Sequence, residues 1–238
     1  MSPRRIALAL CCSLIAGPLA ATELLLPGDY HGDEVTARDR EIWLTLVLDA
    51  DGHTRLEPRP IEIDAIHDAV LDELDAATGK RVGAGSDDAL FHVRDLAGAT
   101  AGEVVSAYIA GGEPLIIDAH LDRGFQINGR EAGRLQLDCA APAADATAHC
   151  ELQLRIDERS QTLASWQAQA RTPGPWMLGN DAYPHLRWAG DLDRDGRLDL
   201  LIDVSDHYNV SAPTLFLSSQ AKPGELVGEA AVLRSVGC

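Results

Sequence analysis

The sequence predicts an all-β fold, arranged as a sandwich, a barrel or a partial propeller-like sheet. Short segments in which polar and apolar residues alternate recur along the chain, and turn-forming residues separate them about every ten positions. No stretch keeps a helical period for more than about three turns. The 238 residues, 46% of them hydrophobic, are enough to bury a core, and this composition argues against disorder.

The first 21 residues are expected to be a secretory signal peptide. Two arginines precede an apolar run at residues 6–15, and the small residues at 18–21 suit a cleavage site. The run is shorter than the ~20 residues that span a bilayer, and no later segment is long and apolar enough to do so. Lipidation at Cys11 or Cys12 is the alternative, but neither follows the small residues of a lipoprotein signal. We therefore expect a periplasmic or extracellular protein without a membrane span.

The chain is strongly acidic. It carries 37 Asp and Glu residues against 20 Lys and Arg residues, for a formal net charge of -17. No cluster of basic residues follows residue 5. Such a protein repels phosphate groups, so nucleic acid is excluded as a partner.

We expect the mature chain to form a β-rich domain at residues 22–172 and a C-terminal β subdomain at 173–238. The subdomain could also be continuous with the preceding domain. The boundary is placed at the Pro- and Gly-containing loop 171–175. An Asp-Gly turn at residues 49–52 predicts a hairpin between the first two main strands. Residues 66–74 fit either a short helix or, with 77–82, another hairpin. The remaining expected strands are at residues 41–48, 54–57, 61–63, 90–93, 104–109, 114–117, 125–127, 134–138, 151–155, 163–168, 186–189, 198–204 and 214–218.

A disulfide is expected between Cys139 and Cys150. Both cysteines flank a short loop, and the segments on either side alternate between polar and apolar residues, as half-buried strands do. A bridge there would clip the hairpin and stabilise the fold by about 3 kcal/mol. Two unpaired buried thiols are the alternative. Cys238 has no obvious partner, so it is either free or paired between chains.

Residues 191–199 carry the strongest chemical signal in the chain. Calcium binds six to eight hard oxygen ligands, which a short acidic loop can wrap around one ion. Gly196, at position six of the loop, permits a sharp turn, and the backbone carbonyl of Arg197 at position seven would add an oxygen. A solvated acidic turn is the alternative. Carboxylates stand at positions one, three, five and nine: Asp191, Asp193, Asp195 and Asp199.

The loop differs from an EF-hand. Position twelve is Ile202, where an EF-hand has a bidentate Glu, and the flanking residues suit strands better than helices. The D-x-D-x-D-G-x-x-D run resembles the integrin-type calcium loop of FG-GAP and VCBS repeats. This resemblance implies a bound Ca2+ on a loop that links adjacent strands of a sheet. The tail at residues 190–238 is also similar to the end of secreted bacterial proteins that carry a single such loop.

Two weaker groupings also lie in the C-terminal part. Asp203, Asp206 and His207 could form a second metal site or an acid–base pair, but a polar turn explains them as well. Three tryptophans could line a sugar-binding platform or lie buried in strands: Trp166, Trp176 and Trp188. The chain has no nucleophile elbow, no zinc-protease motif, no phosphate-binding loop and no dinucleotide fingerprint.

These patterns favour an exported calcium-binding protein in which the ion is structural and the surface binds an unidentified protein or glycan. A catalytic role is less expected than this binding role. Two alternatives stay open. One is a glycan-directed hydrolase with a calcium-stabilised fold, and the other is an inhibitor of another exported protein.

The signal-peptide interpretation predicts that the mature chain starts near Ala21 or Thr22. Because the apolar run and the small residues after it are what signal peptidase acts on, secretion from a bacterial host should remove everything before that point. Intact-mass measurement of the exported protein tests this, and retention of Met1 would contradict it.

Overall fold

The computed structural model describes residues 21–83, 88–110, 115–116, 122–140, 147–169 and 177–237. In these ranges the chain forms β-strands and one 3-10 helix, η1 (Ser218–Gln220), with no α-helix, so the predicted all-β class is confirmed. No helix long and apolar enough to cross a membrane occurs in this part of the chain. Some sequence-based expectations concern residues outside these ranges: residues 1–20 of the signal peptide, the boundary loop 171–175, Trp176 and Cys238.

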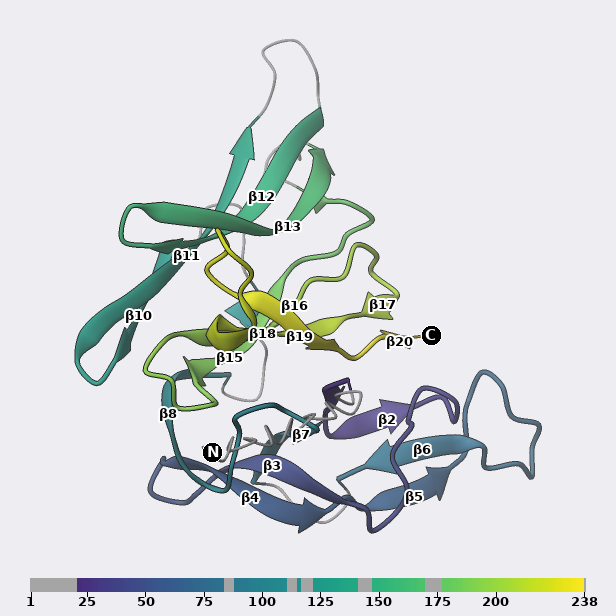
Figure 1. Cartoon of the computed structure of the whole chain (residues 1–238). Coiled ribbons are helices and arrows are strands. Elements are labelled where there is room, and N and C mark those ends of the chain that lie inside the picture. Colours follow the sequence, from purple (N-terminus) through teal and green to yellow (C-terminus); the bar gives the residue numbers. More distant parts are fainter. Residues whose placement is uncertain are drawn as a thin grey trace, which may run out of the picture.

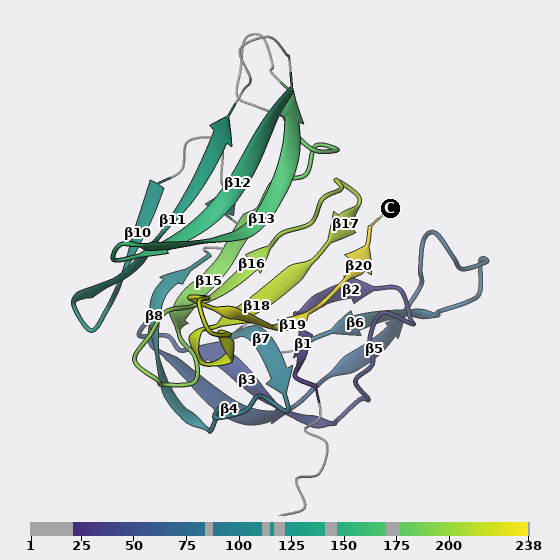
Figure 2. The ribbon, with the colours of Figure 1, turned by 45° about the horizontal axis from the view of Figure 1, so that its top comes forward.

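A strongly curved antiparallel sheet forms most of the molecule (Figure 1). Its first and last strands contact each other, so the sheet nearly closes into a barrel (Figure 2). A short tenth strand, β9 (Leu115–Ile116), pairs with β15 outside the main path. The order along the path is β1 (Glu23–Leu25), β7 (Ala89–Arg94), β3 (Ile42–Leu48), β4 (Thr54–Pro60), β8 (Gly102–Ile109), β15 (His185–Asp191), β16 (Asp199–Asp203), β18 (Pro213–Leu217) and β19 (Gly228–Val232).

Three smaller sheets complete the fold. The two smallest are the pair β17 (Val210–Ser211) and β20 (Ser235–Val236), and a three-stranded sheet in the order β2 (Gly28–Tyr30), β6 (Gly79–Val82), β5 (Ile63–Ile66). A five-stranded meander packs beside the barrel-like sheet (Figures 1 and 2). It runs β10 (Asp122–Ile127), β11 (Arg130–Ala140), β12 (Thr147–Ile156), β13 (Arg159–Gln169), β14 (Met177–Leu178).

Two hydrophobic cores share the wall made by β15, β16 and β18. In β16, Leu201 faces the first core, whereas Leu200 and Ile202 face the second, because successive side chains of a strand point to opposite faces. All five residues of β16 and all five of β18 are buried. The first core fills the barrel-like sheet with Leu24, Leu46, Leu56, Phe91, Val93, Trp188, Leu201 and Leu215. The second joins the wall to the meander through Leu135, Leu152, Trp166, Leu186, Leu200, Ile202 and Phe216.

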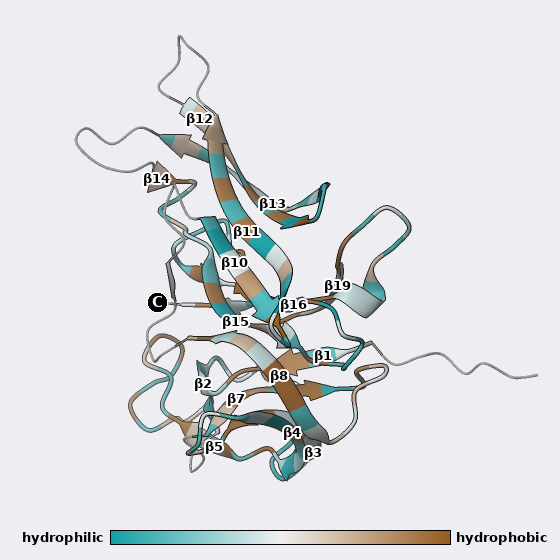
Figure 3. Cartoon of the chain, turned by 90° about the vertical axis from the view of Figure 1, so that its left-hand side faces the viewer, coloured by the Kyte–Doolittle hydropathy of each residue, from teal (hydrophilic) through white to brown (hydrophobic). Residues whose placement is uncertain are grey.

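Hydrophobic and hydrophilic residues alternate along β11 and β12 around the two cysteines (Figure 3), and buried residues alternate with more exposed ones in the same strands. In β11, Leu135 and Leu137 are buried, and they stand opposite Leu154 and Leu152 of β12. The polar residues between them point to the other side. The predicted hairpin is confirmed, and the two-residue period of the sequence decides which of its faces is buried.

Residues 66–74 do not form the short helix that was one of the two expectations. Ile66 ends β5, and residues 67–78 connect β5 to β6 without forming a strand. A hairpin does form, but it pairs Ile63–Ile66 with Gly79–Val82, so the expectation of a hairpin strand within residues 66–74 is also wrong. The Asp68 Oδ1 atom accepts the backbone N–H groups of Val70 and Leu71 at 3.0 and 3.1 Å. The Asp72 Oδ2 atom accepts those of Asp68 and Thr78, both at 2.8 Å. These side chains take up donors that a helix would pair internally, which is why the helix does not form.

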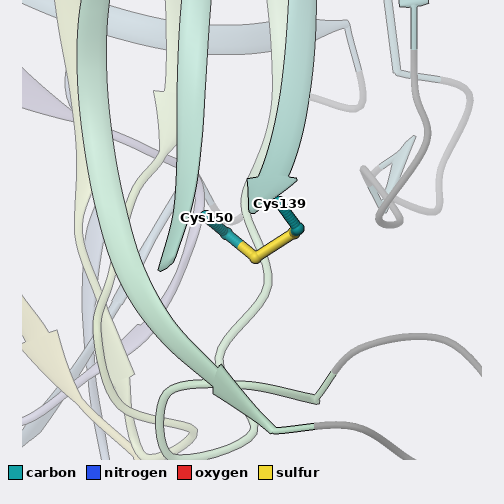
Figure 4. Close-up of a disulfide and its surroundings, with 2 residues drawn as sticks. All are labelled: Cys139 and Cys150. Atoms are coloured by element: carbon teal, nitrogen blue, oxygen red, sulfur yellow. A yellow bond between two sulfur atoms is a disulfide. The ribbon is translucent and has the colours of Figure 1, made fainter. Parts of the chain in front are cut away.

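Cys139 and Cys150 are joined by a disulfide with an S–S distance of 1.99 Å (Figure 4). The two residues stand directly opposite each other on β11 and β12. Cys150 also faces Trp166 of β13 in the register and is fully buried. The disulfide therefore joins the two strands at the loop end of the hairpin, next to the second core.

Removing this bridge should destabilise the protein. We expect the double variant Cys139→Ser/Cys150→Ser to lose about 3 kcal/mol of unfolding free energy, because the unfolded chain regains the entropy of an open loop. Chemical denaturation of the exported protein and the variant measures the difference. Peptide mapping without reductant is the direct check, and free alkylation of both thiols in the folded wild type would contradict the bridge.

His92 is a buried titratable group in the first core's wall. Its ring is 4% exposed, its Nδ1 atom hydrogen-bonds the Thr45 hydroxyl at 2.9 Å, and its Nε2 atom has no partner among the described residues. Burial, helped by the charge of Arg59, lowers the pKa of His92 from its ordinary value of 6.5 to about 4. The imidazole is therefore neutral in the folded protein at neutral pH.

This depressed pKa predicts a loss of stability in acid. The unfolded chain takes up a proton at His92 below about pH 6.5, whereas the folded chain does so only below about pH 4. The unfolding free energy should therefore fall by about 3 kcal/mol from this group between those pH values. His92→Asn should remove this part of the pH dependence in calorimetry. The matched variant at the 80%-exposed side chain of His53, His53→Asn, should retain it, and equal pH slopes would contradict the assignment.

Candidate metal centre

The acidic segment 191–199 is the connection between two neighbouring strands of the large sheet. Asp191 is the last residue of β15 and Asp199 is the first of β16, where it pairs with Gly190 of β15. Leu192 and Leu198 anchor the two ends of the loop. Both are fully buried, Leu192 in the first core and Leu198 in the second. Leu192 and Leu198 thus anchor the loop on opposite faces of the shared wall, and the acidic residues between them project from the wall.

Three of the four predicted carboxylates come together. Each of Asp191, Asp193 and Asp195 offers an oxygen, and the three oxygens lie within 4.8 Å of one another. Asp191 is buried, Asp193 is half-buried and Asp195 is exposed. The cluster therefore runs from the end of β15 outward to solvent, and it could hold a metal ion.

The backbone of the loop folds around these side chains. The Asp191 Oδ2 atom accepts the N–H of Gly196 at 3.0 Å, and the Asp195 Oδ1 atom accepts that of Arg197 at 2.9 Å. Gly196 has a φ of +83°, in the left-handed region that favours glycine. The turn that the sequence places at position six therefore requires this residue.

Asp191 carries the feature that an acidic turn alone does not explain. The residue is only 5% exposed, and its side-chain Oδ1 atom is buried without a hydrogen-bond partner among the described residues. Burial raises the pKa of Asp191 above its ordinary value, and the nearby charges of Asp195 and Asp193 raise it further. A buried carboxylate oxygen without a partner is costly unless a cation or a donor meets it.

Asp199 has a different place from the other three. It is fully buried, and its two oxygens accept the N–H groups of Leu192 and Ser218, each at 2.8 Å. Burial raises the pKa of Asp199 to about 7. The carboxylate thus ties the start of the loop to η1, and Asp199 is not among the residues whose oxygens gather within 4.8 Å. That Asp199 and the Arg197 carbonyl bind a metal ion remains a prediction.

Other side chains around the cluster were not expected from the sequence. The Arg197 guanidinium pairs with Asp195 Oδ2, with its Nε atom at 2.9 Å. The Ser218 hydroxyl donates to the same oxygen at 2.8 Å, and the Ser219 hydroxyl donates to Asp193. Both serines belong to η1, more than twenty residues away, so no local pattern in the loop announced them.

The turn at residues 49–52 is not a second acidic site. The Asp49 Oδ1 atom accepts the backbone N–H groups of Asp51 and His53 at 3.0 and 2.9 Å, as in an ordinary Asp turn. Among the described residues, Asp191, Asp193 and Asp195 are the only group of His, Cys, Asp and Glu side chains placed closely enough to hold one metal ion.

The second grouping near the loop is a polar turn. The buried Asp203 accepts the N–H groups of Ser205 and Ala212 at 3.1 and 2.9 Å, and the hydroxyl of Ser211 at 2.6 Å. The His207 Nδ1 atom accepts the N–H of Asn209 at 3.1 Å. These contacts organise the turns after β16 rather than a metal site.

Trp166 and Trp188 do not form a sugar-binding platform, because both are buried in the cores. The Trp166 Nε1 atom donates to the carbonyl of Ser205 at 2.9 Å, and Trp188 packs edge-on against Phe91 with ring centroids 5.8 Å apart. They follow the commoner pattern of large aromatic residues whose N–H finds a partner inside the protein.

Comparison with known proteins gives no match for this chain among protein-family models, curated proteins or solved structures. The resemblance to the FG-GAP and VCBS loops therefore rests on residues 191–199 alone.

Proposed function

We propose that Asp191, Asp193 and Asp195 bind one Ca2+ ion, with the Arg197 carbonyl and Asp199 completing the protein ligands, and that this ion stabilises an exported β-rich binding module. The observation that carries the proposal is the buried Asp191 Oδ1 atom, which has no partner in the described part of the chain. A divalent cation would give this oxygen a partner and would offset the repulsion among three neighbouring carboxylates.

Calcium is the best-fitting ion because every donor in the set is a hard oxygen. Carboxylates and a backbone carbonyl suit Ca2+ and Mg2+, whereas soft or borderline metals prefer Cys and His. The flexible spacing at positions one, three and five favours the larger ion, since Mg2+ demands near-ideal octahedral geometry. The resemblance of the loop to the FG-GAP and VCBS calcium loops supports the same choice.

The position of the loop supports a structural role. It joins two strands that are buried on both faces, and hydrogen bonds link it to η1 through Asp199, Ser218 and Ser219. Ile202 occupies the position where an EF-hand has its bidentate Glu, and Ile202 lies in the second core. Among the described residues, no pair of helices lies beside the loop for calcium to open, so the structure gives no support to sensor-like switching.

Export agrees with this role. The Cys139–Cys150 disulfide fits an oxidising compartment, as does the signal peptide that the sequence predicts. Extracellular calcium modules bind at about 10⁻⁴–10⁻³ M, a range that exported proteins can meet.

Calcium should raise the melting temperature by a few degrees. A free ion concentration ten-fold above Kd adds about 1.4 kcal/mol to the free energy of unfolding. For a chain of this size, that gain corresponds to a few degrees in melting temperature. Calorimetry with excess chelator and across millimolar calcium measures the shift, and isothermal titration should give one ion per chain. Identical melting curves in both conditions would leave only an acidic turn.

The variant Asp191→Asn sharpens this test. In chelator it should melt at or above the wild type, because a neutral amide replaces a buried carboxylate whose Oδ1 atom lacks a partner. In calcium it should melt below the wild type, because it no longer responds to the ion. Asp51→Asn, in the exposed turn at residues 49–52, is the matched control and should keep the full calcium response.

A further inference from the structure

A cleft of about 570 Å³ lies away from the acidic loop, between the three-stranded sheet and the C-terminal strands. One wall is formed by β2 and by the residues that follow β5, including Tyr30 and Asp68. The other is formed by residues near β15, β17 and β20, including Asp181 and Tyr208. A cleft of this volume lies within the usual range of ligand sites.

Three carboxylates of this cleft are matched by cations. Asp68 is buried and pairs with the Nδ1 atom of His31, a contact that the sequence did not reveal because the two residues are 37 positions apart. Hydrogen bonding to Asp68 raises the pKa of His31, which favours the imidazolium. Asp203 has the Arg187 guanidinium 3.7 Å away, and the Asp29 Oδ1 atom accepts the Nε–H of Arg81 at 2.7 Å. These three pairs add no net charge to the cleft.

Two other carboxylates form no ion pair among the described residues. Glu34 accepts the backbone N–H groups of His31 and Val236 at 3.0 and 2.6 Å, and no ion pair to Glu34 occurs in the described residues. Asp181 has neither a hydrogen bond to its carboxylate nor an ion pair in the same part of the chain. His185, which also lines the cleft, has its pKa lowered by burial and adds no compensating charge at neutral pH. The cleft therefore favours a cationic group, within a chain of net charge -17.

Exposed apolar side chains lie on one wall of this acidic cleft and on the loop that continues from Ala69 of its other wall. These two places hold five of the eight exposed large hydrophobic residues in the described part of the chain. Leu74, at the tip of the loop after β5, is 98% exposed, and Tyr208 across the cleft is 73% exposed. A concentration of apolar surface around a polar centre is typical of a protein-binding site. Tyr208 and Val236 line the cleft, whereas Val70, Leu71 and Leu74 lie on the loop just beyond its lining residue Ala69.

The loop that carries three of these residues is already ordered. The Asp72 side chain is 2% exposed and holds both ends of the loop through the N–H groups of Asp68 and Thr78. Asp68 holds the N–H groups of Val70 and Leu71. An apolar surface held in place by hydrogen bonds within the protein loses little conformational entropy when a partner binds it.

We propose that this cleft docks a segment of a partner protein in which a Lys or Arg side chain is flanked by apolar residues. The basic side chain enters the cleft beside Glu34 and Asp181, and its apolar neighbours pack on Leu71 and Tyr208.

The same observations argue against two other classes of partner. A neutral glycan would leave the aliphatic side chains of the loop uncovered, and one face of the Tyr208 ring is already stacked on His207, with centroids 4.5 Å apart. An anionic membrane surface would be repelled by the exposed carboxylates of Glu73 and Asp75, which stand on either side of Leu74 in the loop.

The test uses the mature, calcium-loaded protein labelled with ¹⁵N and two short peptides, acetyl-Ala-Leu-Lys-Leu-Ala-amide and its Gln counterpart. The Lys peptide should shift the amide signals of residues near positions 31, 70, 181 and 208 in a saturable way. The Gln peptide should bind at least ten-fold more weakly, and raised salt should weaken the Lys peptide.

Matched variants separate the acidic and apolar parts of the site. Asp181→Asn should weaken the Lys peptide three- to ten-fold, whereas Asp157→Asn, at another aspartate with positive φ (53° against 61°), should not. Leu71→Ser should weaken both peptides, whereas Ile42→Ser, at a similarly exposed residue elsewhere, should not (64% against 60% exposed). Equal binding of both peptides, no saturable shifts at 5 mM peptide, or shifts of the same amides by neutral oligosaccharides instead would overturn the proposal.

Discussion

Burial of β15, β16 and β18 on both faces is the constraint on which the rest of the molecule depends. One face of this wall closes the barrel-like sheet through Leu201 and Leu215, and the other supports the meander through Leu200, Ile202 and Phe216. A strand that must satisfy two cores has almost no freedom of register, because a shift of one residue would exchange the two faces. The acidic loop, the cleft and the disulfide-clipped hairpin are all attached to this wall or to sheets packed on it.

The acidic loop is a consequence of that wall as much as of its own sequence. Leu192 and Leu198 enter different cores, so the chain must cross from one side of the sheet to the other within a few residues. The fully buried Asp199 ties this crossing to η1 through two backbone N–H groups. The carboxylates of Asp191, Asp193 and Asp195 are thereby brought close together, and the cost of burying Asp191 is the physical reason to expect a cation there.

The cleft shows a second use of aspartate in the same protein. Asp68 and Asp72 hold a loop open to solvent by accepting its backbone N–H groups, and Asp68 also orients His31. Both the loop after β5 and the acidic loop are thus organised by side-chain-to-backbone hydrogen bonds rather than by regular secondary structure. In each case the ordered loop presents groups that are incompletely satisfied within the chain: carboxylate oxygens at one and apolar side chains at the other.

Local patterns by themselves determined the all-β class, most strand positions, the Cys139–Cys150 hairpin and the spacing of Asp191, Asp193 and Asp195, because each depends on neighbours within about a dozen residues. Only the tertiary structure decided which side chains meet across the sheets: Ser218 and Ser219 at the acidic cluster, His31 with Asp68, and the burial of Trp166 and Trp188. The Asp-rich residues 66–74 were ambiguous because a helix and a side-chain-bonded loop use the same donors. Contacts between residues far apart in sequence follow from how the strands pack, and a two-residue period specifies which face is buried but not what lies against it.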